Sequence, residues 1–128
     1  LINLPLIVYW MIVADFRNNI NFDYVASDII SFSYKELNFI FAIDTTDDNY
    51  VRILLPKTTE TKDKAKYTTD KLIALNSNLK VAKFEMIDDS VWISAEAFVF
   101  SVENISILYQ KLIDMLVFAI DELYKQIN

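Results

Sequence analysis

Glu85 and Glu96 are the two side chains of this sequence that could act together in acid–base chemistry. They fall in two adjacent segments that we expect to be neighbouring strands, where they could face each other as paired catalytic carboxylates do. No nucleophile or oxyanion donor accompanies them. The chain has no histidine and no cysteine, which excludes Ser-His-Asp and Cys-His nucleophile systems, disulfides and zinc sites with the usual ligands. We therefore expect no enzymatic activity, and a carboxylate hydrolase is the least favoured hypothesis.

The segment Asp44–Asn49 is rich in oxygen ligands of the kind that calcium prefers. It lacks the EF-hand pattern, because the sixth position is not glycine and the twelfth, counted from Asp44, is Leu55. A solvated turn is the favoured interpretation, so no metal and no cofactor is predicted. Together with the polar strand side of Ser31 and Ser33, the segment motivates one alternative function, a small-ligand or metal-responsive sensor.

Charge is unevenly distributed along the chain. Seven lysines and three acidic residues lie between Lys57 and Lys83, whereas the chain as a whole carries 12 basic and 18 acidic residues, a net charge of −6. Acidic residues interrupt the lysine run, and the overall charge opposes binding to phosphates. We expect a solvated helix face here and no nucleic-acid partner. The chain also contains no glycine, which excludes P-loop and dinucleotide-binding fingerprints.

Hydrophobic periodicity predicts the elements that position these side chains. A period of two marks strands, and a spacing of three and four marks helices. The predicted elements are a helix over 1–14, a strand pair within 29–43, a strand over 50–55, a helix over 61–79, strands over 81–87 and 91–100, and a helix over 102–127. The strand pair turns near Lys35-Glu36 and the later hairpin around Asp88-Asp89-Ser90, and Ser101 can cap the last helix. The order α-β-β-β-α-β-β-α predicts one α+β domain over 1–128, with an antiparallel sheet made of a three-strand meander plus a hairpin and packed with helices.

The strand over 91–100 has two chemically different sides. Val91, Ile93 and Ala95 form the predicted core side. Three large aromatic residues share the other side: Trp92, Phe98 and Phe100. They are ordinary packing residues if helices cover both faces of the sheet. If they are exposed, they are candidates, with Trp10, for binding a protein partner.

Residues 1–14 are almost continuously apolar, with Pro5 in the first predicted turn. The run is shorter than the about 20 residues needed to span a membrane, and it lacks the charge and cleavage pattern of a signal peptide. It predicts a buried helix, with a subunit interface over residues 7–13 as the alternative. The sequence therefore predicts a cytoplasmic protein without a membrane partner.

Four segments resemble the YbjN-like family, which is related in fold to the class I chaperones of type III secretion. They are ISFSYKELNF at 30–39, RILLP at 52–56, LNSNLKVAK at 75–83 and VWISAE at 91–96. The resemblance implies a small, acidic bacterial α+β domain, often dimeric, whose curved antiparallel sheet is backed by helices and which has no known catalytic activity. With the surplus of aromatic residues, it leads us to expect a non-catalytic protein-binding module, chaperone-like or regulatory. Such a module would act as a homodimer that holds a partner segment on an apolar surface.

Overall fold

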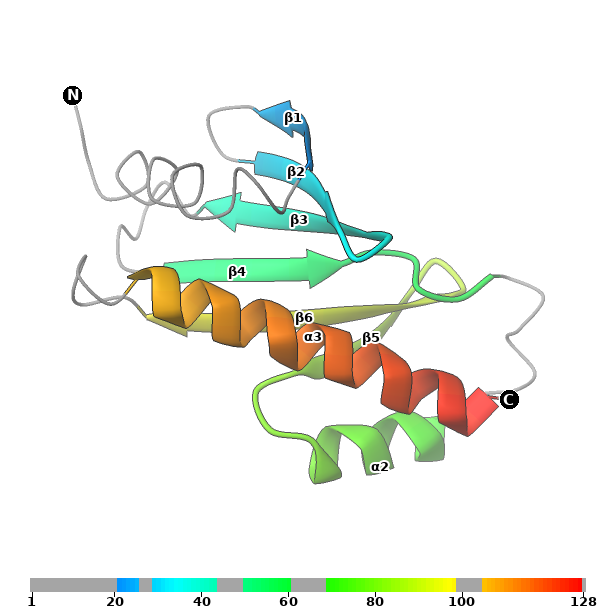
Figure 1. The fold of residues 1–128 in the computed structure, drawn as a ribbon. Coiled ribbons are helices and arrows are strands. Elements are labelled where there is room, and N and C mark those ends of the chain that lie inside the picture. The colour runs from blue at the N-terminus through cyan, green and yellow to red at the C-terminus, as the bar shows by residue number, and fades with distance from the viewer. Residues whose placement is uncertain (1–20, 26–28, 44–49, 61–68, 99–104, 128) are drawn as a thin grey trace.

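The computed structural model describes residues 21–25, 29–43, 50–60, 69–98 and 105–127. These residues form an α+β fold with an antiparallel sheet of six strands and two helices (Figure 1). The elements are β1 (Asn21–Val25), β2 (Ile29–Tyr34), β3 (Leu37–Ile43), β4 (Tyr50–Leu55), α2 (Thr69–Asn78), β5 (Lys83–Ile87), β6 (Ser90–Phe98) and α3 (Ile105–Ile127). The strand order across the sheet is β1-β2-β3-β4-β6-β5, so β5 lies at one edge and β6 lies between β4 and β5.

The described strands from β2 onwards lie where hydrophobic alternation predicts them. The additional strand β1 was not predicted; it pairs with β2, with a register shift between Phe22 and Tyr24. The predicted helix over 1–14, residues 61–68 of the next predicted helix and the Ser101 cap lie outside the described residues. Neither described helix combines the length and the apolar content that crossing a membrane requires.

Both tight hairpins turn through two residues with positive φ. Lys35 and Glu36 have φ of 51° and 63° between the paired residues Tyr34 and Leu37, and the same pattern recurs at Asp88 and Asp89, with φ of 50° and 65°. Two consecutive positive φ angles are the mark of a type I′ turn, which favours asparagine, aspartate and glycine.

In a chain without glycine, asparagine and aspartate are the residues that adopt positive φ most readily. Aspartate does so at the turn between β5 and β6, whereas the other described positions with positive φ are Lys35, Glu36, Lys57 and Val81. Strand register explains the lysine and the glutamate, because six paired residues on each side of the first hairpin fix its two-residue length.

The least favourable of these backbone conformations is at Val81. Its φ is 74°, and the Ala82 N–H donates to the Lys80 carbonyl oxygen at 2.8 Å, which closes a three-residue γ-turn. A β-branched residue at positive φ is a genuine outlier. The turn takes the chain from the end of α2 into the edge strand β5.

We expect Val81→Gly to raise the free energy of unfolding by about 1 kcal/mol. A residue with a Cβ costs about 1–2 kcal/mol in the left-handed region, and the greater chain entropy of glycine offsets part of that relief. Val81 is 55% exposed, so little packing is lost. Urea unfolding measures the change, and Ser77→Gly in the exposed part of α2 is the control, with an expected loss of about 0.5 kcal/mol. A Val81→Gly protein less stable than the parent would contradict this account.

The hydrophobic core lies between one face of the sheet and the two helices. α3 lies across β4 and β6, and α2 lies beside β5 (Figure 1). Tyr109 at the start of α3 packs edge-on against Phe41, with ring centroids 4.9 Å apart. The fully buried large side chains are Tyr109, Phe32, Phe39, Phe41, Ile30, Ile53, Ile93, Leu116, Leu123 and Val91. The predicted core side of β6 is thus confirmed.

Candidate functional site

The face of the sheet opposite the helices carries the candidate site. Register places the side chains of β4, β6 and β5 in rows on this face: Arg52 lies opposite Glu96, and Ser94 lies between Leu54 and Lys83. The residues between them, such as Ile53 and Ile93, point into the core. We call this surface the open face and define it by Tyr50, Arg52, Leu54, Lys83, Glu85, Trp92, Ser94, Glu96 and Phe98.

Four charged side chains on the open face form two crossed ion pairs. Arg52 Nη2 lies 3.5 Å from Glu85 Oε1, and Lys83 Nζ lies 3.6 Å from Glu96 Oε1. Arg52 is on β4 and Glu85 on β5, so the arginine side chain crosses the intervening strand β6. The crossing explains why Ser94, although it points away from the core, is only 4% exposed. Isolated exposed pairs contribute about 0–1 kcal/mol, so the main consequence is a locally neutral surface.

The structure does not bring Glu85 and Glu96 together as a facing pair. They lie on neighbouring strands as expected, but Glu85 is opposite Trp92, and Glu96 lies four positions further along β6. At about 3.3 Å per residue the backbone positions of the two glutamates are offset by roughly 13 Å along the strands, so the register does not place them directly opposite each other. Each glutamate also has its own cation, and the Tyr50 hydroxyl donates to the Glu96 carboxylate. The proposed carboxylate pairing is therefore wrong.

The aromatic residues of β6 share one side, as predicted. Phe98 is 57% exposed and packs edge-on against Tyr50, with ring centroids 5.8 Å apart. Trp92 is half-buried at the other end of the open face, and its indole Nε1 has no hydrogen-bond partner among the described residues. The other two candidates for partner binding, Trp10 and Phe100, lie outside the described residues. The open face thus has an aromatic residue at each end and a neutral ionic cluster between them.

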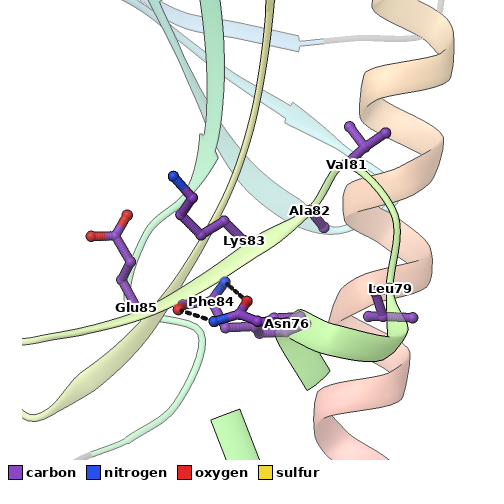
Figure 2. A pocket seen from close by; sticks show the side chains of 7 residues that line it. All are labelled: Asn76, Leu79, Val81, Ala82, Lys83, Phe84 and Glu85. Carbon is purple, nitrogen blue, oxygen red and sulfur yellow. Dashed lines mark hydrogen bonds between the residues drawn. The ribbon is translucent and has the colours of Figure 1, made fainter. Parts of the chain in front are cut away.

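An open hollow of about 560 Å³ adjoins the open face at the edge strand β5. Its lining residues are Asn76, Leu79, Val81, Ala82, Lys83, Phe84 and Glu85. Figure 2 shows the Asn76 amide lying against the backbone of Phe84, whereas Lys83 and Glu85 point away from it. The Phe84 N–H donates to Asn76 Oδ1 at 2.7 Å, and Asn76 Nδ2 donates to the Phe84 carbonyl at 3.1 Å.

The Asn76 amide acts as a one-residue substitute for a neighbouring strand. Edge strands expose unpaired N–H and C=O groups, which invite pairing with other chains. Because Asn76 satisfies both backbone groups of Phe84, α2 closes this part of the β5 edge. Both polar atoms of the amide are occupied, so Asn76 offers little to a small ligand. This role of Asn76 was not predicted, because nothing in the spacing of Asn76 and Phe84 along the chain reveals it.

A second polar cluster fixes the chain after β4 to the start of β6. The Thr58 hydroxyl donates to the Val91 carbonyl at 2.6 Å, the Val91 N–H donates to Thr59 Oγ1 at 3.0 Å, and the Ser90 hydroxyl donates to the Thr59 carbonyl at 2.7 Å. A smaller hollow of about 440 Å³ lies here, lined by Lys57, Thr59, Glu60, Asp88 and Ser90. The hydroxyl groups of this cluster hydrogen-bond the chain after β4 to the start of β6. This favours a structural role for them over a role as nucleophiles.

The features that motivated the sensor hypothesis receive no further support. The loop Asp44–Asn49 lies outside the described residues, and within those that are described no group of three or more acidic, histidine or cysteine side chains is arranged to hold a metal ion. Ser33 lies in β2, where its hydroxyl donates to Asn38 Oδ1 at 3.1 Å. The sensor hypothesis remains a prediction from the sequence.

Comparison with known proteins gives this chain no relative. No family model, no curated protein and no solved structure matches it. The geometry of the open face is therefore the basis for a functional proposal.

Proposed function

We propose that this chain is a non-catalytic protein-binding module that holds a segment of a partner protein on the open face. The proposal includes a chaperone-like or regulatory role in the cytoplasm, a homodimeric state and the YbjN-like and secretion-chaperone-like class of the fold. It includes neither a nucleic-acid nor a membrane partner.

The exposure of Phe98 is the observation that carries the proposal. A phenylalanine ring that is 57% exposed on a sheet face loses little rotamer freedom when it is covered, because Tyr50 already packs against it. Large aromatic side chains of this kind contribute much of the binding energy of protein interfaces.

The ionic cluster beside Phe98 defines the chemistry of the segment that fits. The pairs Arg52–Glu85 and Lys83–Glu96 balance each other, so the open face neither attracts nor repels a partner by net charge. The charged groups still offer hydrogen-bond donors and acceptors at about one strand spacing from each other. The partner segment best matched to this surface places an apolar side chain over Phe98 and has polar groups on either side of that side chain.

A displayed library of random peptides tests the proposal. We expect the protein to select peptides with aromatic or aliphatic residues and Phe98→Ser to weaken their binding by about tenfold or more, because the ring is a candidate hot spot. Binding is measured by the fluorescence anisotropy of a dye-labelled peptide, which leaves both tryptophans of the protein in place.

Ile73→Ser is the matched control. Ile73 is 56% exposed but lies in α2, outside the open face, so its replacement removes a similar apolar area without touching the site. We expect binding by this variant to equal that of the parent. Equal binding by the parent and Phe98→Ser, or a library that yields no binding peptide, would contradict the proposal.

A further inference from the structure

The outer surface of α3 carries a mixed apolar and charged stripe that takes no part in the open face. Residues 107, 111, 114, 118 and 121 are spaced by four and three, so they lie along one side of the helix. All five are exposed, whereas Leu112, Leu116, Ala119 and Leu123 face the core. Ile107 is 58% exposed and Phe118 is 49% exposed. We call this surface the α3 stripe.

Three charged side chains on the α3 stripe, Lys111, Asp114 and Asp121, have no ion-pair partner within the described part of the chain. Asp114 accepts a hydrogen bond from Gln110 Nε2 at 2.9 Å, and Lys125 forms an ion pair with Glu122 at 3.2 Å. Lys111 and Asp121 have no such contact among the described residues. They have opposite charge, lie on either side of Phe118, and are about 15 Å apart along the axis at 1.5 Å per residue.

We infer that the α3 stripe is a homodimer surface on which α3 of a second copy lies antiparallel. A twofold axis between residues 111 and 121 places Lys111 of each copy against Asp121 of the other, which forms two equivalent ion pairs. The same axis passes two residues from Phe118, so the two Phe118 positions are about 6 Å apart along the helices and each lies opposite Asp114 of the other copy. Covering the two rings near the axis removes apolar surface from water. In a parallel arrangement Lys111 would meet Lys111 and Asp121 would meet Asp121. Charge complementarity therefore selects the antiparallel second copy.

The inference rests on the proposed function, because it identifies the surface of the homodimer that the proposal includes. It leaves the open face free, since the α3 stripe and the open face lie on opposite sides of the sheet (Figure 1). One helix from each copy covers less than the about 800 Å² per partner of a standard interface. We therefore expect reversible association in the micromolar range.

Charge exchange at the two positions tests the dimer surface. Lys111→Asp and Asp121→Lys each replace two attractive contacts with two repulsive ones, so we expect each to weaken dimerisation on the order of tenfold. The double variant restores opposite charges across the axis and should return the dimerisation constant to within about threefold of the parent value. Sedimentation equilibrium over about 1–300 µM, which brackets the expected affinity, measures all four proteins.

Two apolar variants complete the test. Phe118→Ser should abolish the dimer over the same concentrations, whereas Ile73→Ser in α2 should leave it unchanged. A parent protein that is monomeric throughout, or a double variant no stronger than the two single variants, would overturn the inference. Peptide binding to the open face is measured on the same proteins, so a failure of the dimer surface is distinguishable from a failure of the proposed function.

Discussion

Replacement of Tyr109 by phenylalanine is expected to raise the free energy of unfolding by about 1–2 kcal/mol at neutral pH. The side chain is 1% exposed, and its hydroxyl has no hydrogen-bond partner among the described residues. Burial of an unsatisfied hydroxyl costs about 1–3 kcal/mol, whereas the ring packs against Phe41 whether or not the oxygen is present. Urea unfolding monitored by circular dichroism measures the difference.

The difference in free energy of unfolding between Tyr109→Phe and the parent should increase at alkaline pH. Burial raises the pKa of the Tyr109 hydroxyl far above its ordinary value, so the folded protein keeps this proton where the unfolded chain loses it. A raised folded-state pKa means that the full stability is present below the unfolded pKa of about 10 and declines as the pH rises above it. Above pH 10 the free energy of unfolding of the parent should therefore fall by about 1.4 kcal/mol per pH unit through this group. Tyr109→Phe lacks the group and should not show this fall.

Tyr124→Phe is the matched control for this prediction. Its hydroxyl is exposed and donates to the Thr58 carbonyl at 2.8 Å, so its removal deletes a hydrogen bond and relieves no burial. We expect a loss of about 0.5–1.5 kcal/mol. A Tyr109→Phe protein that is less stable than the parent would mean that the hydroxyl has a partner in the folded protein.

Replacement of Asn76 by alanine is expected to lower the free energy of unfolding by about 2–3 kcal/mol. The substitution removes two hydrogen bonds and leaves the N–H and the carbonyl of Phe84 without partners at the edge of the sheet. It also removes the group that holds α2 against β5. The same urea titration measures the loss.

Two further variants separate this effect from helix propensity. Asn78→Ala changes an exposed asparagine in the same helix and should change the free energy of unfolding by less than about 0.5 kcal/mol. Asn76→Asp keeps the acceptor for the Phe84 N–H but loses the donor to the Phe84 carbonyl. The decrease in its free energy of unfolding should therefore fall between the decreases of Asn76→Ala and Asn78→Ala. Equal stability of Asn76→Ala and Asn78→Ala would contradict the assigned role.

Alternation was sufficient to predict the strands that carry the open face. In β6, Trp92, Ser94 and Glu96 alternate with residues of the core, and the turn at Asp88-Asp89 before this strand lies where predicted. β1 was missed because its five residues carry only two alternating aromatic side chains, which is too short a pattern to distinguish from a loop. Pairing with β2 is what makes it a strand.

The site was less predictable because it depends on strand order. The sequence shows that Trp92 and Phe98 share a side of β6, but not that β6 lies between β4 and β5. Only that order lets Arg52 reach Glu85 across Ser94, whereas the separation of Glu85 from Glu96 follows from the register of the β5–β6 hairpin alone. The hydrogen bonds between the Asn76 amide and the Phe84 backbone depend on the packing of α2 beside β5, which periodicity does not specify.

Photo-crosslinking from position 98 tests the central claim, that the open face holds a protein segment. A p-benzoylphenylalanine at position 98 replaces the exposed ring with a photoreactive one, and the same group at position 73 in α2 is the control. After illumination in living cells, the account predicts a discrete adduct with another polypeptide from position 98 and none from position 73. Adducts of equal yield from both positions, or none from position 98, would contradict it.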